Sequence, residues 1–343
     1  MDTNDPSSVI FGCRGLSLSV EEKRFFAEAR PLGFILFERN CRDRAQVSAL
    51  VSGLKNITGR DATPILIDQE GGRVQRLKPP EWRAAPTGAA FSALADQDMS
   101  LAEEAIRLNS QIIAAELVEL GINVNCAPVL DVPVPGAHDI IGDRALGLDP
   151  ATVSTLGRAS AQGFLDGGVL PVIKHIPGHG RAGVDSHQEL PLVEASQADL
   201  AASDFIPFQA LKEMPWAMTA HVVYVALDKD QPATTSHRVI TDSIRGQIEF
   251  DGVLLSDDIG MKALVGSFEQ KAMNVLAAGC DLALHCSGDM AEMQDTAVGV
   301  GNVSPETAAR LAKGEAMRGD PTGFDAAAAL KRLNEILIKA ELA

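Results

Sequence analysis

Short apolar runs recur along the whole chain, and most of them are separated by segments with a helical pattern. Runs of this length and composition are typical of strands that are buried on both faces. Strands that alternate with helices form parallel sheets. Eight such units in a chain of 343 residues predict a single closed (β/α)8 barrel, or TIM barrel. The eight candidate strands are Val9–Phe11, Gly33–Phe37, Ile65–Ile67, Ile122–Val124, Leu170–Ile173, Ala217–Thr219, Val253–Leu255 and Leu282–Leu284.

The helical segments carry the expected periodicity and end signals. The segment Leu101–Leu120 places Ile106, Ile113 and other apolar residues on one stripe. Asp149 and Pro150 form a typical start for the next helix. An open doubly wound sheet is the alternative fold, but no Gly-x-Gly-x-x-Gly motif follows the first strand. Further helices are expected at Gln197–Leu211 and Phe268–Ala278.

No linker, low-complexity tract or charge block marks a second domain. We therefore expect one domain over residues 1–343. Ser304 and Pro305 are a plausible cap and first residue of a helix. The Ala- and Leu-rich stretch at about 324–342 is expected to form a long closing helix. The longest insertion, Lys78–Asp98, is expected to form a loop on one rim of the barrel.

The composition excludes several classes of protein. The formal net charge of −16 repels phosphate backbones, so nucleic-acid binding is not expected. Hydrophobic residues make up 46% of the chain, yet no apolar run reaches the roughly 18 residues that span a bilayer, so we expect no membrane partner. Aromatic residues make up only 4%, which favours a small ligand held by hydrogen bonds over a long polysaccharide cleft.

The cysteines and the N-terminal residues bear on the cellular compartment in which the protein works. The five cysteines are odd in number, scattered, and mostly in or beside apolar runs. This pattern is typical of buried thiols in a reducing compartment, not of a disulfide framework. The first six residues are acidic and polar and do not look like a secretion signal. We therefore expect a cytoplasmic enzyme.

The segment Lys174–His187 holds three histidines, a lysine and an aspartate, and it follows the apolar run Val169–Ile173. We expect a strand to end at Lys174 and a glycine-rich loop to begin there. Histidine titrates near neutral pH, and barrel enzymes carry their chemistry at the carboxyl ends of the strands. The segment is therefore a candidate active-site loop, in which Gly178, Gly180 and Gly183 would provide the conformational freedom to bring His187 to the substrate.

Other candidate strands also end in polar residues, which a barrel would gather at one mouth. This convergence of groups that lie far apart in the sequence indicates a site more strongly than any single motif does. The groups are Asp68–Arg76 after the third strand, Asp131 and Ile141–Arg144 after the fourth, Lys174–His175 after the fifth, His221 after the sixth, and Asp257–Asp258 after the seventh.

Several of these residues also have a structural interpretation that the sequence leaves open. Asp68 could cap a helix, Arg144 could form a surface ion pair, and His221 could be a hydrogen-bonded core histidine. His179 lies between two glycines and is interpreted as a hydrogen-bonding residue that shapes the loop. Asp258 is expected to point away from the site and to act as a cap or ion-pair partner.

His175, His179 and His187 raise the question of a metal site. Zinc sites use three or four convergent ligands at fixed spacing, usually on rigid elements. Two of these histidines lie in a glycine-rich loop, and the sequence has no His-Glu-x-x-His pattern or cysteine pair. We therefore expect no metal and no cofactor.

Taken together, the motifs resemble the signature of family 3 glycoside hydrolases, in particular their bacterial β-N-acetylhexosaminidase branch. The matching pieces occur in the family's order, and the ordered set is far more specific than any one piece. They are Asp68-Gln-Glu-Gly-Gly-Arg-Val-Gln-Arg76, Ala127-Pro-Val-Leu-Asp131, Ile141-Gly-Asp-Arg144, Lys174-His-Ile-Pro-Gly-His-Gly180 with Asp185-Ser-His187, Met218-Thr-Ala-His221 and Ser256-Asp-Asp-Ile-Gly-Met261.

The resemblance implies a role for each matched position. Asp257 would be the nucleophile, and His187 would be the general acid/base, paired with Asp185. The departures from the family pattern, such as Ile176 in place of a common phenylalanine, remove no catalytic group. The residues that would bind the N-acetylglucosamine ring are Asp68, Arg76, Arg144, Lys174 and His175.

The implied reaction is a two-step displacement with retention of configuration, through a covalent glycosyl-aspartate. The implied substrate is a peptidoglycan turnover fragment, N-acetylglucosamine linked to a 1,6-anhydro-N-acetylmuramic acid peptide. We expect a monomer whose partner is this small-molecule sugar or muropeptide. Two alternatives stay open. One is a phosphorylase on the same scaffold, since a histidine acid/base does not repel incoming phosphate. The other is a barrel that binds sugar without catalysis.

Overall fold

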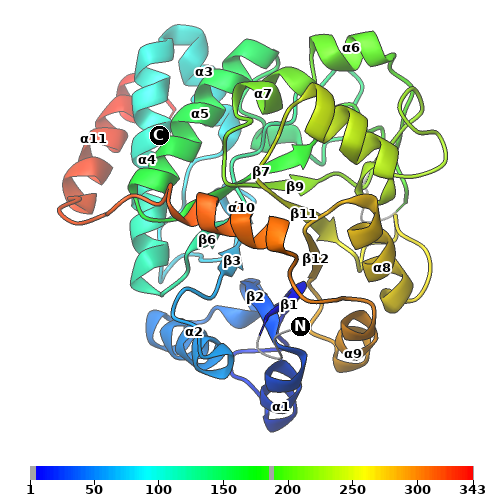
Figure 1. Cartoon of the computed structure of the whole chain (residues 1–343). Coiled ribbons are helices and arrows are strands. Elements are labelled where there is room, and N and C mark those ends of the chain that lie inside the picture. The colour runs from blue at the N-terminus through cyan, green and yellow to red at the C-terminus, as the bar shows by residue number, and fades with distance from the viewer. Residues whose placement is uncertain (1–4, 185–188, 343) are drawn as a thin grey trace.

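The computed structural model describes residues 5–184 and 189–342, in which eight parallel strands close into a barrel surrounded by helices (Figure 1). Neighbouring strands pair in the order β1-β12-β11-β9-β7-β6-β3-β2. This arrangement confirms the predicted TIM barrel. The barrel strands are β1 (Ser7–Gly12), β2 (Pro31–Leu36), β3 (Ile65–Ile67), β6 (Val124–Asn125), β7 (Leu170–Ile176), β9 (Trp216–Thr219), β11 (Val253–Asp258) and β12 (Leu282–His285).

Helices connect the successive barrel strands, as parallel pairing requires. None of the described helices combines the length and apolar character needed to cross a membrane. The helices are α1 (Val20–Ala29), α2 (Arg44–Thr58), α3 (Gly88–Gln97), α4 (Met99–Glu119), α5 (Pro150–Asp166), α6 (Gln197–Ala202), α7 (Phe205–Ala210), a π-helix η4 (Val239–Gln247), α8 (Phe268–Ala278), α9 (Met290–Val298), α10 (Pro305–Glu315) and α11 (Ala326–Lys339). Two small sheets stand outside the barrel: β4 (Gln69–Gly71) with β5 (Val74–Gln75), and β8 (Leu192–Val193) with β10 (Val223–Tyr224).

The start signals of two predicted helices are confirmed. The side chain of Asp149 accepts hydrogen bonds from the first turn of α5, which has Pro150 at its first position. Ser304 caps α10 in the same way, and Pro305 is the first residue of that helix. These caps satisfy backbone N–H groups that have no partner within the helix.

Two segments differ from the prediction. The insertion Lys78–Asp98 is not a simple loop, because its second half forms α3. The helix predicted over Gln197–Leu211 is interrupted at Ser203, which separates α6 from α7. At this break, the Asp204 carboxylate lies 2.7 Å from the Arg181 guanidinium, which belongs to the loop after β7. A contact between segments so far apart cannot be read from local periodicity.

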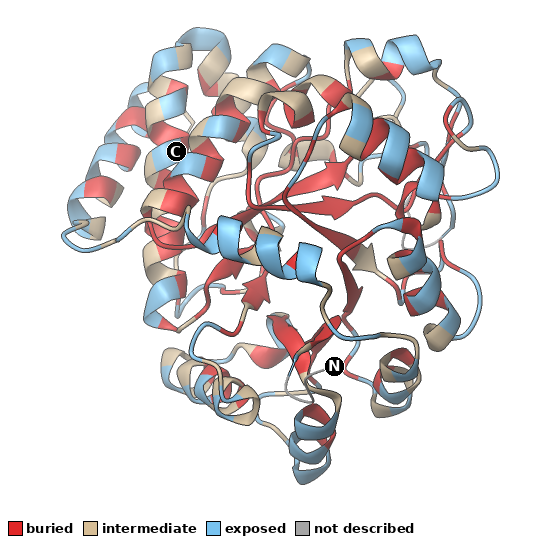
Figure 2. Ribbon diagram, viewed as in Figure 1, coloured by how far each residue is buried: buried red, intermediate tan, exposed pale blue. Residues whose placement is uncertain are grey.

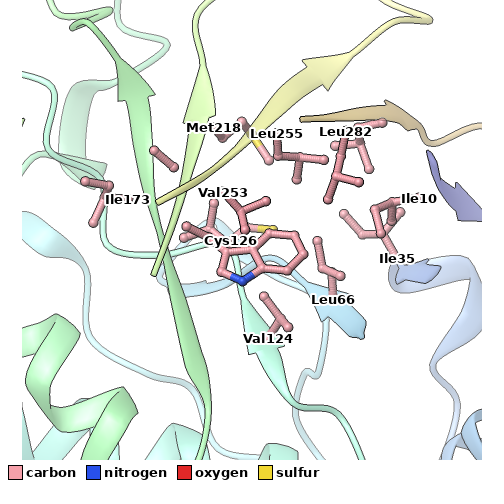
Figure 3. Packing of buried hydrophobic residues seen from close by; sticks show 14 of the residues in the cluster. Ile10, Ile35, Leu66, Val124, Cys126, Ile173, Met218, Val253, Leu255 and Leu282 are labelled. Carbon is pink, nitrogen blue, oxygen red and sulfur yellow. The ribbon is translucent and has the colours of Figure 1, made fainter. Parts of the chain in front are cut away.

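The barrel strands are largely buried, whereas the outer faces of the helices are exposed (Figure 2). Apolar side chains from all around the barrel meet in its interior (Figure 3). Each fully buried aliphatic side chain of this kind contributes roughly 1.5–3 kcal/mol relative to an exposed one. The residues labelled in the figure are Ile10, Ile35, Leu66, Val124, Cys126, Ile173, Met218, Val253, Leu255 and Leu282.

The C-terminal helices cover parts of the barrel away from the site. Leu311 of α10 lines one cavity together with Leu170 and Trp216, at the beginnings of β7 and β9. The helix predicted at about 324–342 is α11, and its Leu333 packs in one apolar cluster with Ile106 of α4. The carboxyl ends of the strands are thus left to form the mouth of the barrel.

Candidate active site

A short antiparallel hairpin after β3 brings Asp68 and Arg76 together. Its turn contains Gly71 and Gly72, whose φ angles of 115° and 54° favour glycine. The buried Gln69 closes the base of the hairpin, since its Oε1 accepts a hydrogen bond from the Arg76 backbone N–H at 2.9 Å. Arg76 Nη2 consequently lies 3.0 Å from Asp68 Oδ2. The hairpin therefore fixes the orientation of the Arg76 side chain.

Strand β7 extends further than predicted. It continues to Ile176, so the prediction that it ends at Lys174 is wrong by two residues. The Lys174 carbonyl accepts a hydrogen bond from Leu130 N–H at 2.7 Å, and the Ile176 carbonyl accepts one from Ala220 N–H at 2.9 Å. The Lys174–His175 peptide bond is cis. Both Lys174 and His175 therefore belong to the barrel wall.

A cavity of about 200 Å³ opens at the carboxyl ends of the strands. It gathers six of the eight residues that were predicted to carry catalysis and sugar binding. The remaining two, Asp185 and His187, lie outside the described residues. The six residues that line the cavity are Asp68, Arg76, Arg144, Lys174, His175 and Asp257.

Ion pairs connect the cationic and acidic side chains of this cavity. Lys174 Nζ lies 2.8 Å from Asp68 Oδ1 and 2.7 Å from Glu70 Oε1. Arg144 binds Glu70 with two hydrogen bonds of 2.8 Å, one from Nε and one from Nη2. Neither Asp68 nor Arg144 therefore has the simple structural role that the sequence left open. Two parallel N–H···O bonds hold a guanidinium in a defined plane.

The ion pairs keep these groups charged despite their burial. Burial by itself raises the pKa of Glu70, but Arg144 and Lys174 outweigh it and lower that pKa to about 2. The pKa of Asp68 is held below its ordinary value in the same way, by Lys174 and Arg76 against the effect of burial. Burial lowers the pKa of Lys174, but Asp68 and Glu70 outweigh burial and raise it. Near neutral pH the cavity therefore contains ionised carboxylates that accept hydrogen bonds and a charged lysine that donates them.

Asp131 orients the imidazole of His175 from behind the cavity. Its carboxylate is completely buried, and Oδ2 lies 2.7 Å from His175 Nδ1. Oδ1 accepts hydrogen bonds from the backbone N–H groups of His175 at 3.1 Å and His179 at 2.6 Å. Burial raises the pKa of Asp131, but His175 outweighs it, and the pKa is about 2. The ring therefore donates through Nδ1 and presents Nε2 on its opposite side.

Replacing Asp131 with asparagine is expected to lower the free energy of unfolding at pH 7 by about 1–3 kcal/mol, because an amide cannot accept all three of the hydrogen bonds that the buried carboxylate accepts. The loss should shrink toward pH 3, since the folded-state pKa lies below the ordinary value and the carboxylate stabilises only above that range. Urea unfolding at both pH values measures this difference.

The matched control for that experiment is Asp143→Asn. Asp143 pairs with Arg73 at 2.8 Å, but both side chains are more than 40% exposed. An exposed pair contributes less than about 1 kcal/mol. Equal effects of the two substitutions at pH 7 would contradict the role of Asp131.

The two carboxylates at the end of β11 have different surroundings. Asp257 lines the cavity, and its Oδ1 accepts a hydrogen bond from Asp258 N–H at 2.8 Å. Asp258 Oδ1 accepts hydrogen bonds from Gly260 N–H at 2.9 Å and Cys286 N–H at 3.2 Å. The predicted capping role of Asp258 is confirmed, but the prediction that it points away from the site is wrong, because this residue also lines the cavity. It fixes the end of β11 against the segment after β12.

Two other histidines near the site have structural contacts. His221 is fully buried, with Nδ1 at 2.7 Å from Thr234 Oγ1 and Nε2 at 3.0 Å from the Asp258 carbonyl, which confirms its interpretation as a core histidine. His179 is buried, and burial together with His175 lowers its pKa to about 4. Across residues 5–184 and 189–342, no group of three or more histidine, cysteine or acidic side chains is arranged to hold a metal ion.

The glycines after β7 allow close packing. A Cβ atom on Gly180 would lie 2.0 Å from the Val132 carbonyl oxygen. Gly178 has a φ angle of 134°, and its added Cβ would meet the Cβ of Asp204 at 2.9 Å. The Gly178 carbonyl accepts a hydrogen bond from the Tyr224 hydroxyl at 2.7 Å. Close packing therefore explains glycine at position 180, whereas the positive φ angle at position 178 also requires the conformational freedom of glycine.

Sequence reasoning missed the roles of Glu70, Asp131 and Phe37. Glu70 stands two residues after Asp68, and residues two apart in an extended segment share a face, so the spacing could have suggested that the two carboxylates lie on one face. Phe37 lines the cavity, and the Arg76 guanidinium lies 5.4 Å from its ring centroid. No signal near Phe37 in the sequence indicates that contact.

Comparisons with known proteins identify the family of the chain. The model of the glycosyl hydrolase family 3 N-terminal domain matches residues 17–313. The beta-hexosaminidase of Bordetella avium is 36% identical over 286 residues, which cover 82% of this chain and 81% of that protein. The beta-hexosaminidase of Alkalilimnicola ehrlichii is 37% identical over 283 residues, with 81% and 80% covered.

Solved structures of related enzymes have the same fold as this chain. The crystal structure of native NagZ from Neisseria gonorrhoeae superposes with a TM-score of 0.86 at 30% identity, and the match covers 97% of this chain and 98% of that one. The beta-N-acetylhexosaminidase of Beutenbergia cavernae superposes with a TM-score of 0.74 at 27% identity and covers 97% and 96%. The chain belongs to glycosyl hydrolase family 3 and is a glycoside hydrolase of the β-N-acetylhexosaminidase type.

Proposed function

We propose that the chain is a retaining exo-β-N-acetylglucosaminidase that removes the terminal N-acetylglucosamine from peptidoglycan turnover fragments. The observation that carries the proposal is the single cavity in which Asp257 meets the ion-paired side chains of Asp68, Arg144 and Lys174. A volume of about 200 Å³ lies below the roughly 300–1,000 Å³ of drug-sized sites, which favours one sugar ring over a longer oligosaccharide.

The cavity offers both acceptors and donors to the hydroxyl groups of a sugar. The ionised Asp68 carboxylate accepts hydrogen bonds, and Lys174 donates them. Arg76 Nε is buried and has no hydrogen-bond partner among the described residues. A buried N–H group without an acceptor destabilises the protein, so a ligand oxygen that accepts a hydrogen bond from Arg76 Nε would be bound favourably. The related NagZ of Neisseria gonorrhoeae has been crystallised with N-trifluoroacetyl-D-glucosamine.

In the first step we assign the nucleophile to Asp257. Its carboxylate oxygen attacks the anomeric carbon while the bond to the leaving oxygen breaks, and a glycosyl ester forms. His187 gives its proton to the leaving oxygen, so the aglycone departs as a neutral alcohol. Asp185 orients the imidazole and stabilises its cationic form. The roles of His187 and Asp185 rest on the sequence motif.

In the second step the neutral His187 accepts a proton from water, and the water oxygen attacks the anomeric carbon. The ester bond to Asp257 breaks, which releases the sugar with its original configuration and restores the carboxylate. One imidazole thus serves as acid and then as base, which suits a group that titrates near neutral pH.

We further propose that the enzyme acts in the cytoplasm, on N-acetylglucosaminyl-1,6-anhydromuramyl peptides. The five cysteines are free thiols, and four of them are buried, which suits a reducing compartment. Exo-action is supported by the small volume of the cavity, which suits a single sugar ring.

Product analysis tests this function. Purified protein should release N-acetylglucosamine both from 4-nitrophenyl N-acetyl-β-glucosaminide and from anhydromuropeptides, and NMR should detect the β-anomer first. Initial formation of the α-anomer would exclude retention. If a sugar 1-phosphate forms when phosphate is added, the phosphorylase alternative holds. Binding without any release would support the non-catalytic barrel.

A further inference from the structure

Glu70 lines the cavity but directs both of its oxygens to cations. Oε1 lies 2.7 Å from Lys174 Nζ and 2.8 Å from Arg144 Nη2, and Oε2 lies 2.8 Å from Arg144 Nε. The Glu70 side chain is only 9% exposed. These contacts leave little of the carboxylate for a substrate. Glu70 therefore acts on its two cationic neighbours rather than on the sugar.

Among the described residues, the aspartates and glutamates that line the cavity balance its lysines and arginines. This part of the lining contains four carboxylates, Asp68, Glu70, Asp257 and Asp258, and four permanently cationic groups, Arg73, Arg76, Arg144 and Lys174, beside the imidazole of His175. N-acetylglucosamine has no charge, so a balanced cavity can bind its hydroxyl groups without also attracting free anions. An unneutralised cation in a partly buried site attracts anions far more strongly than one in water does.

The positive charge of Arg144 is neutralised mainly by the carboxylate of Glu70. Asp68 contacts Lys174 and Arg76, so Lys174 would keep one carboxylate if Glu70 were neutral. Arg144 would keep, among the described residues, a hydrogen bond of 3.1 Å to the Ile140 carbonyl and the weaker attraction of Asp131 and Asp68, but no hydrogen bond to a carboxylate. The Arg144 side chain is 11% exposed, so water can neutralise it only in part.

We propose that Glu70 is a specificity-determining residue, which neutralises Arg144 and Lys174 so that the cavity accepts an uncharged sugar ring and excludes small oxyanions. The identity of the sugar rests on the proposed function, whereas the neutralisation is a property of the three side chains. Glu70 positions its neighbours and does not itself take part in the chemistry.

The test is Glu70→Gln, which keeps the shape of the side chain and removes its charge. Sulfate is titrated into the full-length protein without sugar, by calorimetry at constant ionic strength. The variant should bind sulfate at least about tenfold more tightly than the wild type, a difference of about 1.4 kcal/mol. Sulfate should also raise the KM of the variant for the aryl glycoside while leaving kcat unchanged.

Two further variants separate charge from structural damage. Glu104→Gln removes one partner of the exposed Glu104–Arg332 pair between α4 and α11 and should behave like the wild type. The double variant Glu70→Gln/Arg144→Gln restores the balance of charges, so its affinity for sulfate should return toward the wild-type value. Tighter sulfate binding that persists in the double variant would overturn the proposal.

The wild-type protein provides a readout that does not depend on the folding of any variant. N-acetylglucosamine should compete with the substrate, and sulfate should not. The proposal is overturned if sulfate competes with the wild type as strongly as the sugar does, or if folded Glu70→Gln binds sulfate no better than the wild type. Failure of the wild type to hydrolyse any glycoside would contradict the proposed function and would leave the sulfate titration unaffected.

Discussion

Replacing Asp257 with alanine is expected to reduce kcat by about a thousandfold or more, because the covalent intermediate can no longer form. Asp257 lies at the end of β11, and its carboxylate accepts a hydrogen bond from the neighbouring backbone. Its removal opens space at the mouth of the barrel and should cost little stability. The measurement is kcat with 4-nitrophenyl N-acetyl-β-glucosaminide, together with the melting temperature.

The neighbouring carboxylate is the matched control for that prediction. Asp258 binds backbone N–H groups of Gly260 and Cys286, so Asp258→Asn should lower the melting temperature and keep a much larger share of kcat. Azide should restore turnover of an activated substrate by Asp257→Ala, because a small anion can attack the anomeric carbon from the side that the carboxylate has vacated. An Asp257→Ala protein with a nearly normal rate would rule out the covalent scheme.

Replacing His187 with alanine is expected to lower kcat/KM by about 10²- to 10⁴-fold for substrates whose leaving group needs a proton. The loss should be greatest for the sugar aglycone of a muropeptide and smallest for dinitrophenol, which departs as a stable anion. The measurement compares glycosides that differ only in the pKa of the leaving group, for the variant and for the wild type.

The same set of glycosides should also be measured with the Asp185→Asn variant. It keeps the histidine but removes the group that orients it, so we expect a smaller loss with the same dependence on the leaving group. A loss that is uniform across all leaving groups would assign His187 to substrate binding and not to proton transfer.

The barrel could be predicted from the sequence because its signals are local. Each buried strand is a short apolar run, and helices such as α5 begin at capping residues that form their contacts within one turn. Where the structure departs from the prediction, a distant contact intervenes. The break between α6 and α7 occurs where Asp204 pairs with Arg181, and β7 continues because Ala220 bonds to Ile176.

The sequence predicted which residues lie in the candidate site, but it did not predict the ion pairs and hydrogen bonds that connect them. Parallel strands bring their carboxyl ends together, so polar residues after several strands indicated one mouth. The partners of Glu70 and Asp131 depend on side-chain directions from different strands, and no spacing in one segment encodes them. Glu70 and Arg144, for example, form their bidentate pair across 74 positions of sequence.

The most direct test of the account is to trap the covalent intermediate. A fluorinated N-acetylglucosaminyl fluoride slows both chemical steps by destabilising the positively charged transition state, while its good leaving group preserves the first step. Mass spectrometry of the digested protein should then find one fluorinated sugar attached to the carboxylate of Asp257. Turnover of this reagent without any adduct, or an adduct on a different residue, would contradict the assignment of Asp257 as the nucleophile.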